Sequence, residues 1–184
     1  KMQSPLNNIS SSCQVCHREE AATLMANVYE RQDKIIENRV KLEEMLVRAH
    51  VEAKKAWDLG ATENEMKEIL KGIRHAQWRW DYAAAGHGSS FHSPVETGRV
   101  ISTGIAIVQE TRIKLARLLA SKGFNQEVPY PDISTKEKAQ EFIGLDMKKL
   151  NEDKQDFLKN IVPQWMNAAK EREATYNKVF YNKE

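Results

Sequence analysis

Hydrophobic residues recur at helical spacing over a long stretch near the start of the chain. From about Glu19 to Leu59 there is neither proline nor glycine, and an apolar side chain returns every seven residues. This spacing keeps the apolar side chains on one face of a helix, and Gly60 supplies a C-terminal stop. The pattern predicts one long amphipathic helix over residues 19–59, with an apolar stripe formed by Leu24, Val28, Ile35, Leu42, Leu46, Ala49, Ala53 and Ala56.

Two further helices begin at capping sequences. Thr62-Glu63-Asn64-Glu65 is a capping box, and it predicts a helix over residues 63–85 that a glycine-rich break then ends. Ser93-Pro94-Val95-Glu96 repeats the signal with proline in the first helical position, and it predicts a helix over residues 94–122.

The last third of the chain predicts shorter helices after a proline-bearing loop. Ser134-Thr135-Lys136-Glu137 is a third capping box, opening a helix that ends near Gly144. A last helical stretch begins near Asp146, and Pro163 is expected to kink or interrupt it. No segment shows the period-two alternation typical of a strand, so the predicted fold class is all-α.

The predicted organisation is a loop over residues 1–18 followed by a helical region over residues 19–184. A chain of 184 residues suits one domain of ordinary size. The long helix would span roughly 60 Å, whereas a compact globule of this chain length has a radius of gyration of about 16 Å. We expect it to pack along a larger body or a partner subunit. A helical hairpin folded on itself fits the periodicity equally well.

Composition and charge exclude several functions. Hydrophobic residues make up 41% of the chain and charged residues 29%, which suits a chain with a buried core. A net charge of +2 is too small to argue for nucleic acid or an anionic membrane. No run of eighteen apolar residues predicts a membrane span. The chain opens on Lys1 rather than methionine, and its first residues are expected to be the middle of a longer protein.

The candidate chemistry lies in Cys13-Gln14-Val15-Cys16-His17, which uses both cysteines of the chain. A Cys-x-x-Cys-His sequence is typical of covalent haem attachment. Two thiols three positions apart can reach the two vinyl groups of one porphyrin. The histidine that follows is then placed to ligate the iron. The motif predicts a c-type haem held by Cys13, Cys16 and His17.

Three other interpretations of the same motif remain open. A redox dithiol would need a thioredoxin-like βαβ context, which the sequence does not predict. A structural zinc site needs four ligands, and the motif supplies three, so a distant histidine would have to complete it. The cysteines could also be inert.

The remaining histidines divide into two groups. His50 and His75 lie inside predicted helices among charged residues, and we expect them on the surface. His87 and His92 lie between the second and third helices, where a side chain can turn toward a porphyrin face. Both are candidate axial ligands, although His87 could instead bond to backbone at a helix end.

Several motifs, taken in order, resemble one family. Together they look like the C-terminal portion of the pentahaem cytochrome c nitrite reductases, the ammonia-forming enzymes, and the resemblance covers nearly the whole chain. The motifs are Ser4-Pro5-Leu6, Cys13-Gln14-Val15-Cys16-His17, Ala76-Gln77-Trp78-Arg79-Trp80-Asp81, Ala85-Gly86-His87-Gly88, Phe91-His92-Ser93-Pro94 and Pro131-Asp132-Ile133-Ser134-Thr135-Lys136-Glu137-Lys138-Ala139-Gln140.

The resemblance implies roles for individual residues. Cys13, Cys16 and His17 match the attachment site and proximal ligand of the family's last haem. His92 matches a distal ligand of a different haem, attached further upstream, so the two histidines would ligate two irons. His87 matches no ligand. The long helices match the part of the family's fold that forms the homodimer interface.

The resemblance also implies what the chain lacks. The family's catalytic haem is held by Cys-x-x-Cys-Lys, which is absent from this sequence. The family's active-site arginine, tyrosine and histidine and its calcium site also lie upstream, so no catalytic residue is expected here. The chain would be a fragment of a periplasmic enzyme with a quinol-linked or cytochrome electron donor. Alone it is expected not to reduce nitrite, and to lack haem when made in a reducing cytosol.

Two other functions remain open beside a fragment of nitrite reductase. One is an independent monohaem c-type electron-transfer protein. The other is a haem-free helical interaction module that keeps an unused motif.

Overall fold

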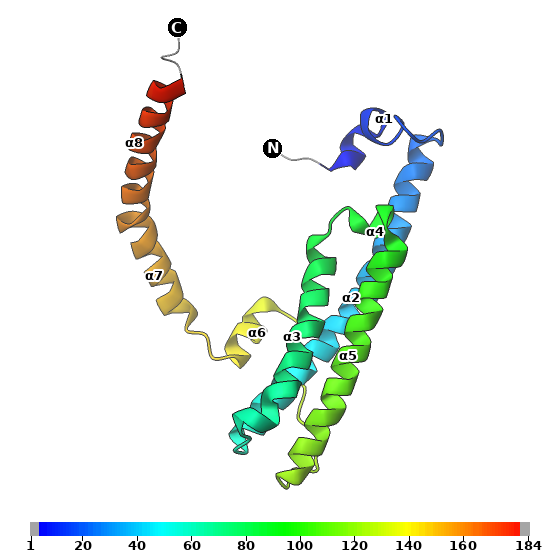
Figure 1. Ribbon diagram of the computed structural model, residues 1–184, viewed down its shortest axis with the longest axis vertical. Helices are drawn as coiled ribbons and strands as arrows, with labels where there is room; N and C mark the ends of the chain where they lie inside the picture. The colour runs from blue at the N-terminus through cyan, green and yellow to red at the C-terminus, as the bar shows by residue number, and fades with distance from the viewer. Residues whose placement is uncertain (1–3, 181–184) are drawn as a thin grey trace. The chain divides into compact units, whose positions relative to one another are not determined.

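The computed structural model describes the backbone of residues 4–180 and the side chains of residues 4–176. Every regular element in that range is helical, which confirms the all-α prediction. The three helices expected over residues 19–59, 63–85 and 94–122 are present with nearly those bounds (Figure 1). They are α2 (Ala21–Asp58), α3 (Glu63–Ala85) and α5 (Pro94–Ser121).

The opening segment, expected to be loop, contains two short helical elements. A 3₁₀ turn, η1, covers Pro5–Asn8, and α1 covers Ile9–Ser12. Proline suits the first helical position because it has no N–H to lose. The Ser12 hydroxyl then donates to the Asn8 carbonyl over 2.6 Å. Serines that looked like chain breakers therefore support a helical turn by bonding back to it.

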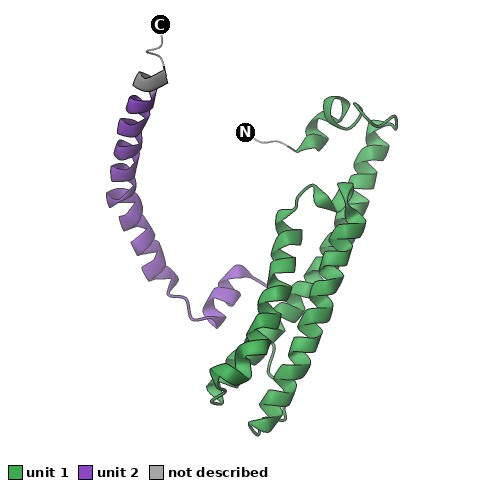
Figure 2. Ribbon diagram, viewed as in Figure 1, with its two compact units in different colours: residues 1–130 green, residues 131–184 purple. Residues whose placement is uncertain are grey.

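The chain divides into two compact units, with the border between Tyr130 and Pro131 (Figure 2). The helices after residue 130 thus form a compact unit of their own. The first unit contains α2, α3, a short helix α4 (Ser89–His92) and α5. The second contains α6 (Lys136–Phe142), α7 (Met147–Asn160) and α8 (Val162–Phe180).

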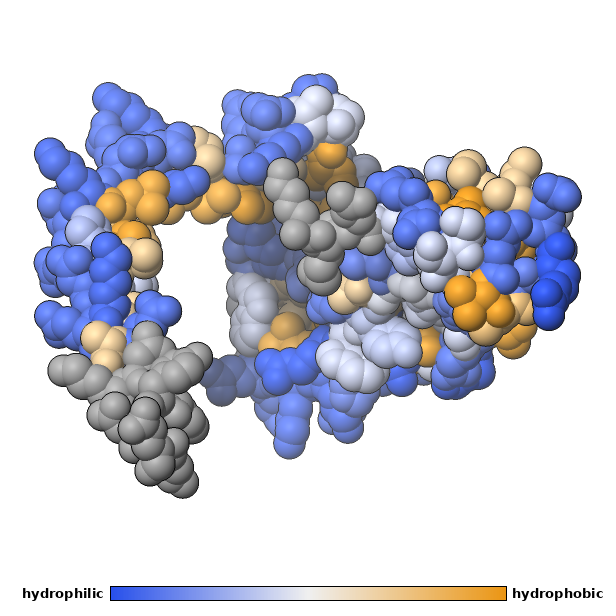
Figure 3. Space-filling view, turned by 90° about the horizontal axis from the view of Figure 1, so that it is seen from above, coloured by the Kyte–Doolittle hydropathy of each residue, from blue (hydrophilic) through white to orange (hydrophobic). Residues whose placement is uncertain are grey.

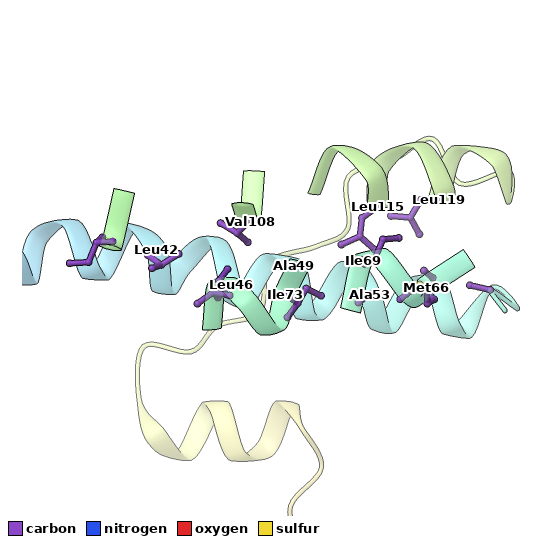
Figure 4. Close-up of a cluster of buried hydrophobic side chains, with 14 of the residues drawn as sticks. Leu42, Leu46, Ala49, Ala53, Met66, Ile69, Ile73, Val108, Leu115 and Leu119 are labelled. Carbon is purple, nitrogen blue, oxygen red and sulfur yellow. The ribbon is translucent and has the colours of Figure 1, made fainter. Parts of the chain in front are cut away.

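The core of the first unit lies between α2, α3 and α5. Leucines and alanines of α2 point toward Met66, Ile69 and Ile73 of α3 and toward Val108, Leu115 and Leu119 of α5 (Figure 4). Full burial of one such aliphatic side chain stabilises a fold by about 1.5–3 kcal/mol. The largest side chains that are completely buried are Leu42, Met66, Ile101, Val108 and Leu115.

The stripe of the long helix is covered within its own unit. All eight of its predicted residues, from Leu24 to Ala56, are buried, and α3 and α5 both pack against α2. The folded-back arrangement therefore accounts for the stripe, and the stripe by itself requires no partner subunit.

Two glycines let the helices approach closely. A Cβ atom at Gly72 of α3 would clash with the Thr111 hydroxyl of α5 and lie 3.2 Å from its Cβ. A Cβ atom at Gly104 of α5 would lie 2.8 Å from a methyl group of Leu42. The Thr111 hydroxyl donates to the Ile107 carbonyl over 2.7 Å, so this buried polar group is satisfied.

Each pair of long helices is also joined by a polar contact. Arg112 of α5 donates to both carboxylate oxygens of Glu52 on α2 over 3.0 Å. Trp80 of α3 donates from its indole to Glu43 of α2 over 3.2 Å. The third pair is joined by Lys122, just after α5, which donates to Glu65 of α3 over 3.0 Å. Ion pairs that are partly withdrawn from water help fix which helix faces meet.

The predicted caps are correct in one case and wrong in two. Thr62 and Glu65 form the expected reciprocal capping box. Ser93 precedes α5 but makes no side-chain capping bond, since its backbone conformation is not that of a capping residue. At α6 the capping residue is Thr135 and not Ser134, because the Ser134 hydroxyl and amide are bound to Asp132.

The second unit has an exposed apolar surface. None of the described side chains in α6, α7 and α8 is buried. Helix α7 ends at Asn160, three residues before Pro163 in α8, which agrees with the expected interruption. Hydrophobic residues interrupt the hydrophilic surface of these helices in the space-filling view (Figure 3). The large exposed ones include Leu150, Phe157, Leu158, Trp165, Met166 and Tyr176.

Gly72→Ala is expected to destabilise the chain by about 1–3 kcal/mol, because the added methyl group overpacks the contact between α3 and α5. Gly98→Ala is the matched control: it also lies inside a helix, but nothing lies within 4 Å of the added Cβ. It should leave stability unchanged or raise it by up to about 1 kcal/mol, since alanine favours helix. Urea denaturation followed by circular dichroism measures both. Equal effects of the two substitutions would contradict the close contact.

Glu65 is expected to make stability fall with acid. The Thr62 backbone N–H, followed by Lys122 and the Thr62 hydroxyl, lowers the pKa of Glu65 from 4.5 to about 2. A lowered folded-state pKa contributes stability that is present above pH 4.5 and lost as the pH falls toward 2. The stability difference between wild type and Glu65→Gln should therefore be largest above pH 4.5 and shrink below it. Melting temperatures of both proteins from pH 7 to pH 2 test this, and a constant difference would argue against it.

Candidate functional site

The Cys-x-x-Cys-His motif is wound into a helical turn that follows α1. The Cys16 and His17 amides both donate to the Cys13 carbonyl, over 3.1 and 2.9 Å. The Cys13 amide in turn donates to the Ile9 carbonyl over 2.9 Å. Residues three and four apart lie on one face of a helical turn. The backbone therefore keeps Cys13, Cys16 and His17 within one helical turn and on one face of it, although the three side chains do not form a compact ligand group.

Contacts on either side hold this turn in place. Ile9, which starts α1, is buried. The Gln14 side chain donates to the Glu19 carbonyl over 3.1 Å, and this bond joins the motif to the segment before α2. His17 Nδ1 lies 3.8 Å from a Glu19 carboxylate oxygen, within ion-pair range but beyond hydrogen-bond length. With Nδ1 facing the carboxylate, Nε2 is the nitrogen left for a metal.

The donor set fits a covalently bound haem. Both thiols are free, Cys16 is exposed and Cys13 half-buried. The His17 side chain is 53% exposed. Two free thiols and one imidazole on the same face of an open turn are the groups needed for two thioether bonds and one axial ligand.

The competing interpretations of the motif fit the structure less well. Over the described residues, no group of three or more His, Cys, Asp or Glu side chains could hold a metal ion, so no fourth ligand joins the motif as a structural zinc site requires. Residues 4–180 also contain no strand, so a thioredoxin-like βαβ setting is missing from that range.

His92 is the last residue of α4 and its side chain is exposed. The sequence placed it in a loop, and the structure places it at the end of a short helix. The His92 amide donates to the Gly88 carbonyl over 3.2 Å. The Phe91 ring lies against the imidazole, with ring centroids 4.7 Å apart and planes at 48°.

Two side chains from the long helices hold α4. Arg31 of α2 donates to the Phe91 carbonyl over 2.9 Å. The Thr97 hydroxyl of α5 lies 2.9 Å from the Ser93 carbonyl and 3.2 Å from the Ser89 carbonyl. Sequence reasoning missed Arg31 and Thr97. Arg31 lies 60 positions from Phe91, and no local pattern signals such a contact.

The other histidines stay apart from the motif's turn. His50 and His75 are exposed on their helices, as expected. His87 is exposed in the break after α3, and its amide donates to the Ala85 carbonyl over 2.9 Å.

The two neighbouring tryptophans face different ways. Trp80 packs against the core, whereas Trp78 is 63% exposed and stacks on Tyr82 with ring centroids 6.1 Å apart.

Over the part of the chain that the structure describes, no helix is long and apolar enough to cross a membrane.

The comparisons with known proteins agree on one family. The family model for cytochrome c552 matches residues 1–177. Proteins named cytochrome c-552 from Parabacteroides distasonis and Porphyromonas gingivalis are each 54% identical, over 170 and 167 residues. The protein of that name from Bacteroides thetaiotaomicron is 53% identical over 169 residues.

These alignments cover 92%, 91% and 92% of this chain but 34% of each relative. The chain thus spans about a third of the length of the curated relatives it matches. The family model covers nearly every residue, including Cys13, Cys16, His17 and His92. The resemblance found from ordered motifs is confirmed, and the chain belongs to the cytochrome c552 family.

Proposed function

We propose that this chain is the C-terminal part of a periplasmic, ammonia-forming cytochrome c nitrite reductase. In that enzyme it carries one electron-transfer haem on Cys13 and Cys16, with His17 as proximal ligand. His92 ligates the iron of a second haem, which is attached outside this chain. The observation that carries the proposal is the helical winding of the motif, which keeps Cys13, Cys16 and His17 within one turn while both thiols are free.

The position of α4 supports two different irons for the two histidines. Arg31, which holds the Phe91 carbonyl, lies ten residues into α2, about 15 Å along its axis from Ala21. His17 precedes that helix. Two imidazoles on one iron need nitrogens within a few ångström of each other, because a metal–nitrogen bond is about 2 Å long.

Each residue of the motif then has a definite task. Cys13 and Cys16 form thioether bonds that prevent loss of the group. His17 would offer Nε2 to the iron, because its Nδ1 lies on the side of the Glu19 carboxylate. The bound haem supplies a one-electron redox couple. The exposed turn leaves room for it against the part of the enzyme outside this chain.

The catalytic centre belongs to that other part. The absence of Cys-x-x-Cys-Lys from the sequence supports this division, as does the share of 34% that the chain covers of its relatives. We infer that the calcium site and the contact with a quinol-linked or cytochrome donor also lie outside this chain. Exposed apolar residues on α7 and α8 support a larger assembly around it. The haem-loaded chain alone should not reduce nitrite.

A second line of apolar residues on α2 supports a homodimer. Tyr29, Ile36 and Val40 are spaced seven and four apart, which puts them on one face, and each is more than 40% exposed. This line is separate from the buried stripe that packs against α3 and α5. We assign it to the dimer interface of the enzyme.

Covalent haem is the first outcome to test. The chain should be exported in a bacterium with c-type maturation machinery and then extracted with acid–acetone. We expect the Soret band to survive extraction in wild type and in Val15→Ala, a matched change inside the motif at an exposed position. Cys13→Ser with Cys16→Ser should abolish the retained absorbance. Wild-type protein that matures without haem would favour the helical interaction module instead.

Association through α2 can be tested in the full-length enzyme. Ile36→Glu together with Val40→Glu should shift the protein from dimer toward monomer in analytical ultracentrifugation, because two charges would enter an apolar contact. Lys34→Glu, on the same helix at a solvated position paired with Glu30, is the control. An unchanged dimer in the double variant would refute this interface.

A further inference from the structure

The helix that ends at His92 is too short to be stable by itself. Helix α4 contains four residues, about one turn. The first turn of a helix fixes several backbone angles for a single hydrogen bond, so an isolated turn does not persist. Its capping position is Gly88, which offers no side chain. The orientation of His92 therefore depends on contacts from outside α4.

One contact comes from α2. Arg31 donates to the Phe91 carbonyl over 2.9 Å, and a charged donor makes the stronger kind of hydrogen bond. Phe91 is half-buried, and its ring packs on the His92 imidazole. A change in the Phe91 backbone would turn this ring and alter the surface against which the imidazole rests.

The other contact comes from α5. Thr97 is 2% exposed, and its hydroxyl proton is shared between the Ser93 and Ser89 carbonyls. Ser89 is the first residue of α4, and Ser93 is the residue just after the end of α4. Thr97 thus holds both ends of the turn while Arg31 holds its middle.

We propose that Arg31 and Thr97 are positioning residues that set the orientation of the His92 imidazole plane toward an iron. This inference rests on the proposed role of His92 as an axial ligand. Neither residue touches the metal: Arg31 acts through Phe91, and Thr97 acts through the backbone of α4. Partners beyond the ligands orient metal-bound histidines and tune the metal.

The test uses electron paramagnetic resonance of the full-length, haem-loaded enzyme. His92→Ala should convert one low-spin haem to high spin, and this identifies the signal that belongs to the His92 iron. In Arg31→Met and in Thr97→Val that same signal should stay low-spin with a shifted largest g value. The g values of a low-spin haem depend on the orientation of its axial imidazoles. Signals of the other haems should not move.

Matched controls lie close by. Arg99→Met removes a charge from the first turns of α5, where Arg99 pairs with Glu96. Thr103→Val removes a hydroxyl that bonds the Arg99 carbonyl within the same helix. Neither should shift the signal. Arg31→Lys should largely restore the wild-type g value, because the contact uses a single donor.

The outcomes separate the two claims. If His92→Ala produces high-spin haem but Arg31→Met and Thr97→Val leave the signal unchanged, the positioning role is wrong and the ligand role stands. If His92→Ala leaves every haem low-spin, the ligand role itself fails, and the positioning inference fails with it. Arg31 is an exposed residue, so its variant gives an answer even where Thr97→Val folds poorly.

Discussion

The close packing of α3 and α5 on α2 is the constraint on which the rest of the first unit depends. Gly72 and Gly104 remove the two side-chain atoms that would hold these helices apart. With that spacing, Leu42, Val108 and Leu115 are completely buried between them. The polar contacts that join the helices in pairs help determine which faces of the helices meet.

Both candidate haem-binding elements are short and take their positions from this bundle. The Cys-x-x-Cys-His turn immediately precedes α2 and is tied to its approach by Gln14. Helix α4 bridges α3 and α5 and is held by one side chain from α2 and one from α5. The long helices thus serve as a rigid frame, which is the arrangement that precise ligand geometry requires.

The sequence predicted the long elements well because their signals are local. The heptad stripe, the Thr62 capping box and Gly60, which has a φ of +78°, each act within one or two turns. The prediction from the sequence was wrong where a residue with a local helix or turn signal had another hydrogen-bond partner. Ser134 binds Asp132 instead of capping α6, and the serines before the motif support helical turns. The border at residue 130 was missed, since helix signals continue on both sides of it.

The candidate site could be predicted only in part. Cys13, Cys16 and His17 form a contiguous motif, and their gathering on one face follows from its helical winding. The supports of His92 come from residues far away in sequence, so they became visible only once the helices were packed. The resemblance supplied the assignment of His92 to a different iron, and the position of Arg31 along α2 agrees with it.

The most direct test is a high-resolution structure of the haem-loaded full-length enzyme. We expect a haem bonded to Cys13 and Cys16 with His17 Nε2 on its iron. We expect His92 on the iron of another haem, whose thioether bonds go to cysteines outside this chain. A single iron ligated by both His17 and His92, or a motif whose cysteines carry no haem, would contradict this assignment.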